Sequence, residues 1–202
     1  MAYPTVDAPY GLKPVNLIGG QVFAGSTRLM QIASGYATNI FYGDLVKRIP
    51  DGTIEKDTGT TTATPVGIFL GVSFTNGSTG QVQQQQFYPA SQSIKSGTQI
   101  FAVVADDPDT LFQVVSCSAT TTVAGMGIAA IGSNIALIQN AGSTTTGNSA
   151  VAIDEGTQAT TNTLPIRIID VVRETATGAD TFVEFIVKIN ATMHQYNNST
   201  GV

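Results

Sequence analysis

Short runs of alternating hydrophobic and polar residues fill most of the chain, and this period of two predicts β-strands. Glycine, asparagine or aspartate separates successive runs, as expected for turns. The predicted strands lie in segments 28–33, 39–49, 65–74, 81–89, 99–105, 110–119, 164–172 and 181–190. In the last of these, the alternate residues from Val183 to Ile189 share one face, which we expect to be buried. No segment shows a sustained helical stripe, so the predicted fold class is all-β.

The two remaining parts of the chain are less regular. Residues 1–20 contain Pro4, Pro9 and Pro14, which favour extended chain and predict an N-terminal arm. The apolar residues of this arm indicate that it is ordered, against either its own domain or a neighbour. Segment 123–139 is interpreted as strand, turn and strand, whereas the threonine- and glycine-rich segment 140–163 predicts a loop or exposed hairpin.

Composition excludes several classes of function. A net charge of −5 and a pI near 4.6 disfavour nucleic acid as a partner, and Lys47-Arg48 is the only adjacent basic pair. No apolar run is long enough for a transmembrane helix, and the start of the chain does not resemble a secretion signal. We therefore expect synthesis in a cytoplasm and no membrane partner. Cys117, the single cysteine, is expected to be a small buried hydrophobe.

The acidic stretch "VADDPDTLF" is the strongest candidate for ionic chemistry. Asp106, Asp107 and Asp109 surround Pro108, but the glycine and the distal glutamate of a calcium loop are missing. Acids on one loop also lack the separation of a glycosidase pair. The favoured interpretation is a proline-fixed turn between two strands, whose carboxylates accept hydrogen bonds from the backbone. An intersubunit contact and cation binding stay open as alternatives.

Other motifs give no support for catalysis. Segment 125–130 matches a dinucleotide fingerprint, but the next residues interrupt any helix, and the first acid downstream is Asp154. His194, the only histidine, lies in a polar tail that suggests exposure, without a local carboxylate or nucleophile. We therefore expect no enzyme, cofactor, metal site or small-molecule substrate.

Several segments resemble the capsid decoration (cement) proteins of tailed bacteriophages, particularly those of marine and cyanobacterial phages. They are "AYPTVDAPYGLKPVNLIGG", "IFYGDLVKRIPDGTIEK", "TPVGIFLGVSF", "FAVVADDPDTLFQVV" and "VEFIVKINATMHQY". The second and third of these segments form a middle module that is similar to the β-tulip barrels of phage head-stabilising proteins. By this resemblance, barrel turns would be shaped by Gly43, Asp44, Asp51, Gly52, Pro65 and Gly67.

The resemblance implies an architecture of a β-tulip-like barrel and/or a jelly-roll-like β-sandwich with an extended N-terminal arm. The expected parts are an arm (1–20), a barrel module (21–105), additional strands or a jelly-roll-like subdomain (106–195) and a tail (196–202). It further implies a homotrimer on the outer surface of the virion, bound to the lattice of the major capsid protein. Contacts with the shell or a neighbour are expected from Tyr3, Pro4, Tyr10, Leu12, Pro14, His194 and Tyr196. The body is expected to fold without the arm.

Two other functions compete with this one. The chain could be a carbohydrate-binding β-sandwich on a surface or adhesion module, although it has no tryptophan for a sugar platform. It could also be another structural virion protein such as the major capsid protein, although that fold needs a long spine helix and a larger chain.

Overall fold

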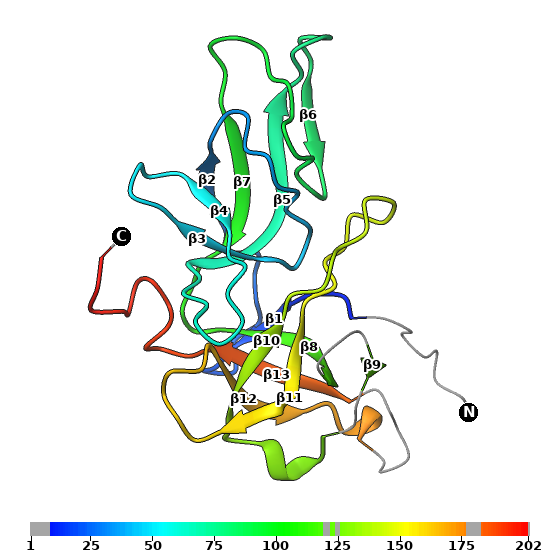
Figure 1. Ribbon diagram of the computed structural model, residues 1–202, viewed down its shortest axis with the longest axis vertical. Coiled ribbons are helices and arrows are strands. Elements are labelled where there is room, and N and C mark those ends of the chain that lie inside the picture. Colours follow the sequence, from blue (N-terminus) through cyan, green and yellow to red (C-terminus); the bar gives the residue numbers. More distant parts are fainter. Residues whose placement is uncertain (1–8, 119–121, 124–125, 177–182, 202) are drawn as a thin grey trace.

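The computed structural model describes residues 9–118, 122–123, 126–176 and 183–201, and within these ranges the chain is all-β. Two sheets are stacked along the long axis of the molecule (Figure 1). The first sheet contains β2 (Arg28–Ile32), β3 (Leu45–Arg48), β4 (Ile54–Lys56), β5 (Gly67–Thr75), β6 (Val82–Gln85) and β7 (Ile100–Ala105). The second contains β1 (Lys13–Leu17), β8 (Thr110–Ser118), β9 (Thr122–Val123), β10 (Asn134–Ile138), β11 (Ala152–Ala159), β12 (Ile166–Val171) and β13 (Glu184–Ile189).

Strand pairing closes both sheets. In the second sheet, β8, β11, β10, β12 and β13 pair in this order, and β13 pairs again with β8 to complete a five-stranded barrel. In the first sheet the order is β3-β4-β2-β7-β5-β6, and an additional β3–β5 pairing joins five strands into a ring. Helical structure in the described ranges is limited to two short 3₁₀ turns, Ile128–Ala130 and Arg173–Thr175. The predicted all-β class with a barrel is therefore confirmed.

The alternation of residues explains why β13 forms where it does. Its buried and half-buried positions alternate along the whole strand, with Phe185, Val187 and Ile189 in the barrel interior. Val183, just before the strand, is buried as well. The expected buried face from Val183 to Ile189 is thus confirmed, because a period of two places alternate side chains on one side of a sheet.

The segment 140–163, predicted as a loop or exposed hairpin, contains a strand of the barrel. Residues 152–159 form β11, which pairs with β10 and, in parallel, with β8, and so supplies one wall of the barrel. Gly156 and Gln158 are its exposed positions, and Asp154 and Glu155 are only half-buried, so the polar composition concealed the strand. Segment 123–139 contains the short strand β9, a 3₁₀ turn and β10, close to the predicted strand-turn-strand.

The N-terminal arm is part of the fold. β1 pairs antiparallel with β8, with Lys13 opposite Gln113 and Leu17 opposite Thr110. Leu12 is completely buried in the hydrophobic cluster of the second sheet. Removal of residues 1–20 would therefore open the core and uncover one edge of β8, which argues against the expectation that the body folds without them.

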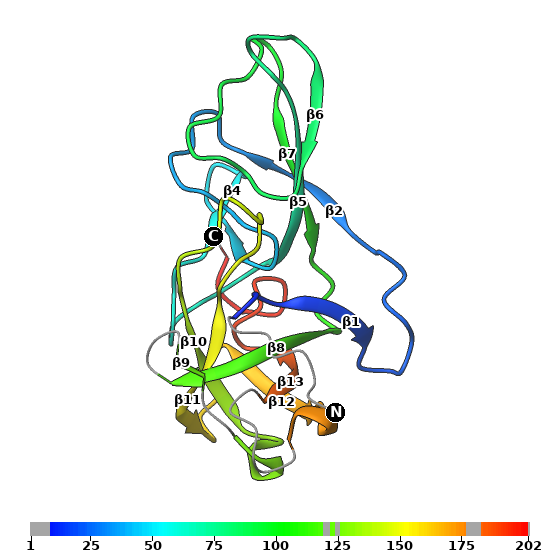
Figure 2. The same ribbon diagram turned by 90° about the vertical axis from the view of Figure 1, so that its right-hand side faces the viewer.

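Several segments join the two sheets, and residues 106–109 connect β7 directly to β8. Residues 18–27 lead from β1 to β2 along one side of the molecule (Figure 2). The connection between β10 and β11 rises beside the first sheet, where Tyr42 forms a bridge with Asn148. The C-terminal segment returns to the first sheet on the other side of the view in Figure 1. In the part of the chain that is described, no helix has the length and apolar character needed to span a bilayer.

Candidate functional site

The acidic stretch forms the connection from β7 to β8, where the chain passes from one sheet to the other. Pro108 and Asp109 lie in a turn. The backbone N–H of Asp109 donates to Asp107 Oδ1 at 2.8 Å, and that of Thr110 donates to the Asp107 carbonyl at 3.1 Å. Asp107 therefore caps backbone donors, as the sequence interpretation required of all three acids.

The other two carboxylates bind side chains instead. Asp106 is buried and forms an ion pair with Arg28 Nε at 2.7 Å, and the Tyr196 hydroxyl donates to the same oxygen at 2.6 Å. Asp109 Oδ1 accepts a bond from Lys188 Nζ at 2.6 Å. The sequence did not reveal these pairings, because their partners lie about 80 or 90 residues away. They fix β2, β13 and the C-terminal segment to one turn.

His194 is buried, with 1% of its surface exposed, so the expected surface position is wrong. The turn around His194 folds the segment after β13 back onto the connection between β7 and β8, which we call the junction. The His194 ring packs against the Tyr196 ring, with centroids 5.3 Å apart. The expectation that His194 contacts the shell or a neighbour is therefore wrong. Its side chain makes its contacts within the chain. Tyr196 remains half exposed.

Asp44 joins three parts of the molecule. Its carboxylate is fully buried and accepts bonds from the Phe41 N–H (2.8 Å), Lys56 Nζ (2.9 Å) and the Ser149 hydroxyl (2.6 Å). Ser149 belongs to the connection between β10 and β11. This geometry supports the structural role that the resemblance implies for Asp44. Gly43, just before it, has a φ of +93°, a conformation that favours glycine.

The hairpin between β3 and β4 contains Asp51 and Gly52. Gly52 has a φ of +85°, and its N–H donates to the Ile49 carbonyl at 2.9 Å. Asp51 Oδ1 accepts bonds from the N–H and hydroxyl of Thr53, and these bonds lower the pKa of Asp51. The loop has three residues with glycine last, a common hairpin geometry.

Gly67 does not shape a turn, contrary to the resemblance. It lies in β5, where a Cβ atom would overlap the Ala105 carbonyl and come within 2.9 Å of the Asp106 Cα. Glycine is needed here because β5 and β7 approach closely at the junction. Pro65, just before the strand, is buried and its carbonyl accepts the Gln195 N–H at 3.1 Å.

Among the described residues, no group of three or more His, Cys, Asp or Glu side chains is placed to hold a metal ion. Cys117 is buried, and burial together with nearby acids raises the pKa of its thiol to about 11. The thiol is therefore protonated and unreactive at neutral pH.

The expected contact residues of the arm occupy different environments. Tyr3 and Pro4 lie outside the described residues. Tyr10 is buried, and its hydroxyl donates to Glu184 Oε1 at 2.6 Å, so it contacts its own chain. Leu12 is in the core, so the expected contact with the shell or a neighbour is wrong for this residue as well. Pro14 is half-buried at the outer edge of the second sheet, opposite Phe112.

The most distinctive surface lies on one face of the first sheet. Strand register places one set of side chains on the outer face of β2, β7, β5 and β6. We call this set the distal surface: Leu29, Gln31, Ser73, Thr75, Val82, Gln84, Phe101 and Val103. Its large apolar members are exposed by 63% at Leu29, 70% at Val82 and 36% at Phe101.

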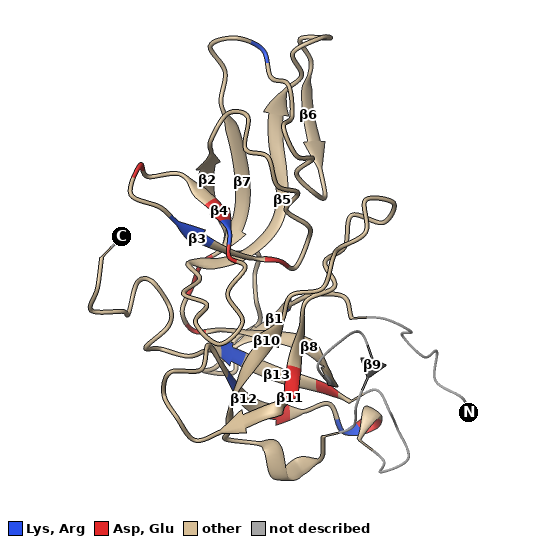
Figure 3. Cartoon of the chain, viewed as in Figure 1, with Lys and Arg blue, Asp and Glu red and all other residues tan. Residues whose placement is uncertain are grey.

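Charge is nearly absent around the distal surface. The segment 58–105 contains a single charged residue, Lys95. Figure 3 shows the other charges on β3, β4 and their hairpin, near the connection between β7 and β8, and over the second sheet. A surface without charge and with exposed apolar groups is suited to contact with another protein, because little desolvation of ions opposes binding.

The strand β6 makes the same region suitable for pairing with another chain. It lies at the end of the first sheet's strand order, next to β5 alone. Val82 points outwards, whereas Gln83 and Gln85 are half-buried on the inner side. Proteins usually protect such edges with charge or proline, and β6 carries neither. The sequence analysis missed this surface, although the run of uncharged residues was a signal for it.

Comparison of the chain with protein-family models, with curated proteins and with solved structures finds no match.

Proposed function

We propose that the chain is a structural virion protein without enzymatic activity. In this proposal it is a decoration (cement) protein that binds the exterior of an icosahedral phage head as a homotrimer and stabilises it against the pressure of packed DNA. The support from sequence is the resemblance of the segments quoted above, and the support from structure is the distal surface. The observation that carries the proposal is the exposed apolar group Leu29, Val82 and Phe101 on the distal surface, none of whose members is charged.

The mechanism is stabilisation by binding. A ligand that binds the assembled shell, and does not bind separated subunits, shifts the equilibrium towards the assembled shell by mass action. Three linked copies bind far more tightly than one, because the second and third contacts form at a high effective concentration.

The proposal predicts that head binding depends on the distal surface. Replacing Leu29 and Phe101 together by serine should lower the affinity for undecorated heads at least tenfold. Each side chain contributes about 1.5 to 3 kcal/mol when fully buried, and about 1.4 kcal/mol corresponds to a factor of ten. The measurement is co-sedimentation with purified heads, with light scattering to establish the number of copies in the free protein.

Ile128 supplies a matched control. It is 60% exposed on the 3₁₀ turn of the second sheet, so Ile128→Ser removes a similar apolar group from another part of the surface. This variant should bind heads like the wild type. Binding should also persist when the salt concentration is raised, because few charges lie in the contact. Equal loss in both variants, or a free monomer that binds no head, would contradict the proposal.

One observation favours carbohydrate binding as a second candidate. Phe101 is exposed between Gln31 and Ser73, its partners across the sheet, and an aromatic ring among amide and hydroxyl groups can contact a sugar. A glycan array distinguishes the two functions. Specific binding that Phe101→Ser removes, together with no binding to heads, would support this candidate in place of the first.

A further inference from the structure

The C-terminal segment, residues 190–201, begins on the second sheet. The Asn190 N–H donates to the Pro165 carbonyl at 2.7 Å, and its side-chain amide donates to the Leu164 carbonyl at 3.1 Å. The Thr192 hydroxyl donates to the Asn162 carbonyl at 2.6 Å. These bonds hold the start of the segment against the chain that precedes β12.

The same segment then binds the first sheet. The Gln195 side chain pairs with the backbone of Arg48 on β3: the Arg48 N–H donates to Oε1 at 2.8 Å, and Nε2 donates to the Arg48 carbonyl at 3.0 Å. The Gln195 N–H donates to Pro65, and the Tyr196 hydroxyl donates to Asp106. We call residues 190–201 the strap, since they bind both sheets.

His194 lies at the centre of the strap. Its N–H donates to the Asn190 carbonyl at 3.0 Å, and its carbonyl accepts the N–H groups of Asn197 and Asn198. Its ring atom Nδ1 accepts the Tyr196 N–H at 3.2 Å. A nitrogen that accepts a bond carries no hydrogen, so the ring is neutral and its hydrogen is on Nε2. Nε2 is buried, with no hydrogen-bond partner among the described residues.

Protonation conflicts with this arrangement in two ways. A hydrogen added to Nδ1 would point at the Tyr196 N–H, so two donors would face each other and the bond would be lost. The new positive charge would also lie inside the protein, where desolvation opposes it. We propose that the strap is an acid-sensitive latch, in which protonation of His194 releases residues 194–198 from the first sheet.

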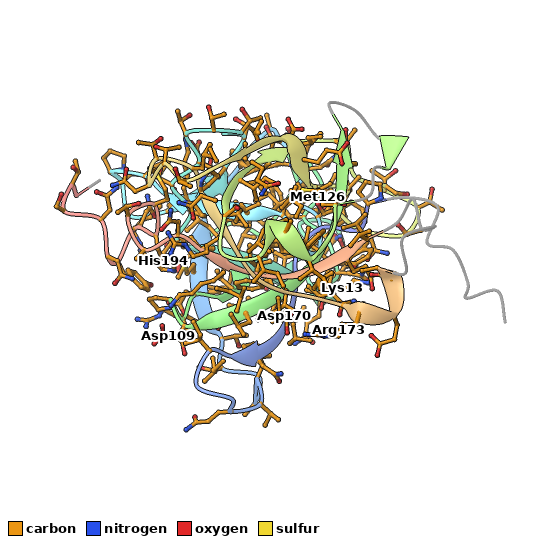
Figure 4. The ribbon with its side chains drawn as sticks, turned by 90° about the horizontal axis from the view of Figure 1, so that it is seen from below. Lys13, Asp109, Met126, Asp170, Arg173 and His194 are labelled. Atoms are coloured by element: carbon orange, nitrogen blue, oxygen red, sulfur yellow. The ribbon has the colours of Figure 1, made fainter. Side chains whose placement is uncertain are left out.

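The charged groups around His194 compensate for this cost only in part. Asp106 and Asp107 lie in the turn before β8, but Asp106 already binds Arg28 and the Tyr196 hydroxyl. Lys188 on β13 opposes a positive charge, and Arg48 on β3 is held at its backbone by Gln195. Figure 4 shows His194 on the same side of the molecule as Asp109, which binds Lys188.

The direction of the pH effect follows from burial. Burial lowers the pKa of His194 below its ordinary value of 6.5, although Asp106 and Asp107 oppose this shift and Lys188 adds to it. The released strap takes up protons at about pH 6.5, whereas the bound strap does so only at lower pH. The latch therefore stays closed above pH 6.5. Its opening equilibrium increases by up to about tenfold for each pH unit below this value, until the lowered pKa is reached.

The single histidine makes the test direct. The ring of His194 gives the only histidine signal in an NMR titration of the full chain, and its apparent pKa should lie below 6.5. Hydrogen exchange, corrected for intrinsic rates, should show a loss of protection at the amides of residues 194–198 between pH 7.5 and 5.0, by at most about thirtyfold. Amides in β13 should keep their protection over the same range.

Two variants separate this histidine effect from other causes. His194→Asn keeps an acceptor close to the Nδ1 position but cannot be protonated, so its strap amides should exchange equally at the two pH values. Tyr196→Phe removes the bond to Asp106 and should loosen the strap at both values while the response to acid remains. A wild-type pKa of 6.5 or above, or an unchanged acid response in His194→Asn, would overturn the proposal.

Discussion

At the scale of single residues, the buried pair of Asp44 and Lys56 has the greatest energetic consequence. The Asp44 carboxylate is inaccessible to solvent, and the Lys56 side chain is only 10% exposed. Two charges in such a place are tolerated because they are paired and because Phe41 and Ser149 supply further hydrogen bonds. Removing one partner leaves the other charge buried without compensation.

Asp44→Asn is therefore expected to lower the free energy of unfolding by about 3 to 5 kcal/mol, the usual effect of breaking a buried pair. Urea unfolding followed by circular dichroism measures the change. Asp51→Asn serves as the control, because Asp51 is an exposed acid in a turn of the same module and should have a much smaller effect. Equal losses in the two variants would show that the Asp44 pair has no special role.

At the scale of elements, the close approach of β5 and β7 depends on Gly67. Gly67→Ala would force the new methyl group against the Ala105 carbonyl and the Asp106 backbone, which cannot rotate away. We expect a loss of about 1 to 3 kcal/mol in unfolding free energy, as for other overpacked sites. Gly19→Ala is the matched control, since a methyl group there meets open space. Thermal unfolding of both variants tests the prediction, and a neutral Gly67→Ala would contradict it.

The strands show which features of the fold the sequence could reveal. Alternation located β2, β7 and β13 well, because each has one face that is more buried, whereas β8 was found as an apolar run and is buried on both sides. It missed β11, whose outward residues are polar and whose burial depends on partners far away in sequence. The same limit applies to His194, because a polar local sequence predicts exposure and only the return of the strap to the junction buries it. Asp107 and Gly52 were predictable, since turns are determined locally.

At the scale of the whole molecule, the two sheets share one core. Leu45 of β3 and Ile68 of β5 belong to the first sheet, yet they pack in the same buried cluster as Phe112, Val187 and the barrel interior. A second cluster, around Phe69 and Tyr88, fills the first sheet alone. The shared cluster indicates that neither sheet keeps its full core when the other unfolds.

We therefore expect cooperative unfolding. Calorimetry at neutral pH should show one transition, with a ratio of calorimetric to van't Hoff enthalpy close to one. Leu45→Ala should lower the midpoint of this single transition without splitting it, because the residue contributes to both sheets. Two resolved transitions in the wild type would show that the sheets are independent units.

The position of β1 has a consequence for how the chain acquires its fold. Lys13 is opposite Gln113, so the first strand must wait for a partner one hundred residues later. The ribosome releases the whole of the first sheet before β8 appears, and Leu12 stays without its final neighbours during that time. Contacts so distant in sequence slow folding, because a large loop must close before they form. The early part of the nascent chain should therefore be the last to dock, and an unpaired β8 edge would be the main risk of misassembly during synthesis.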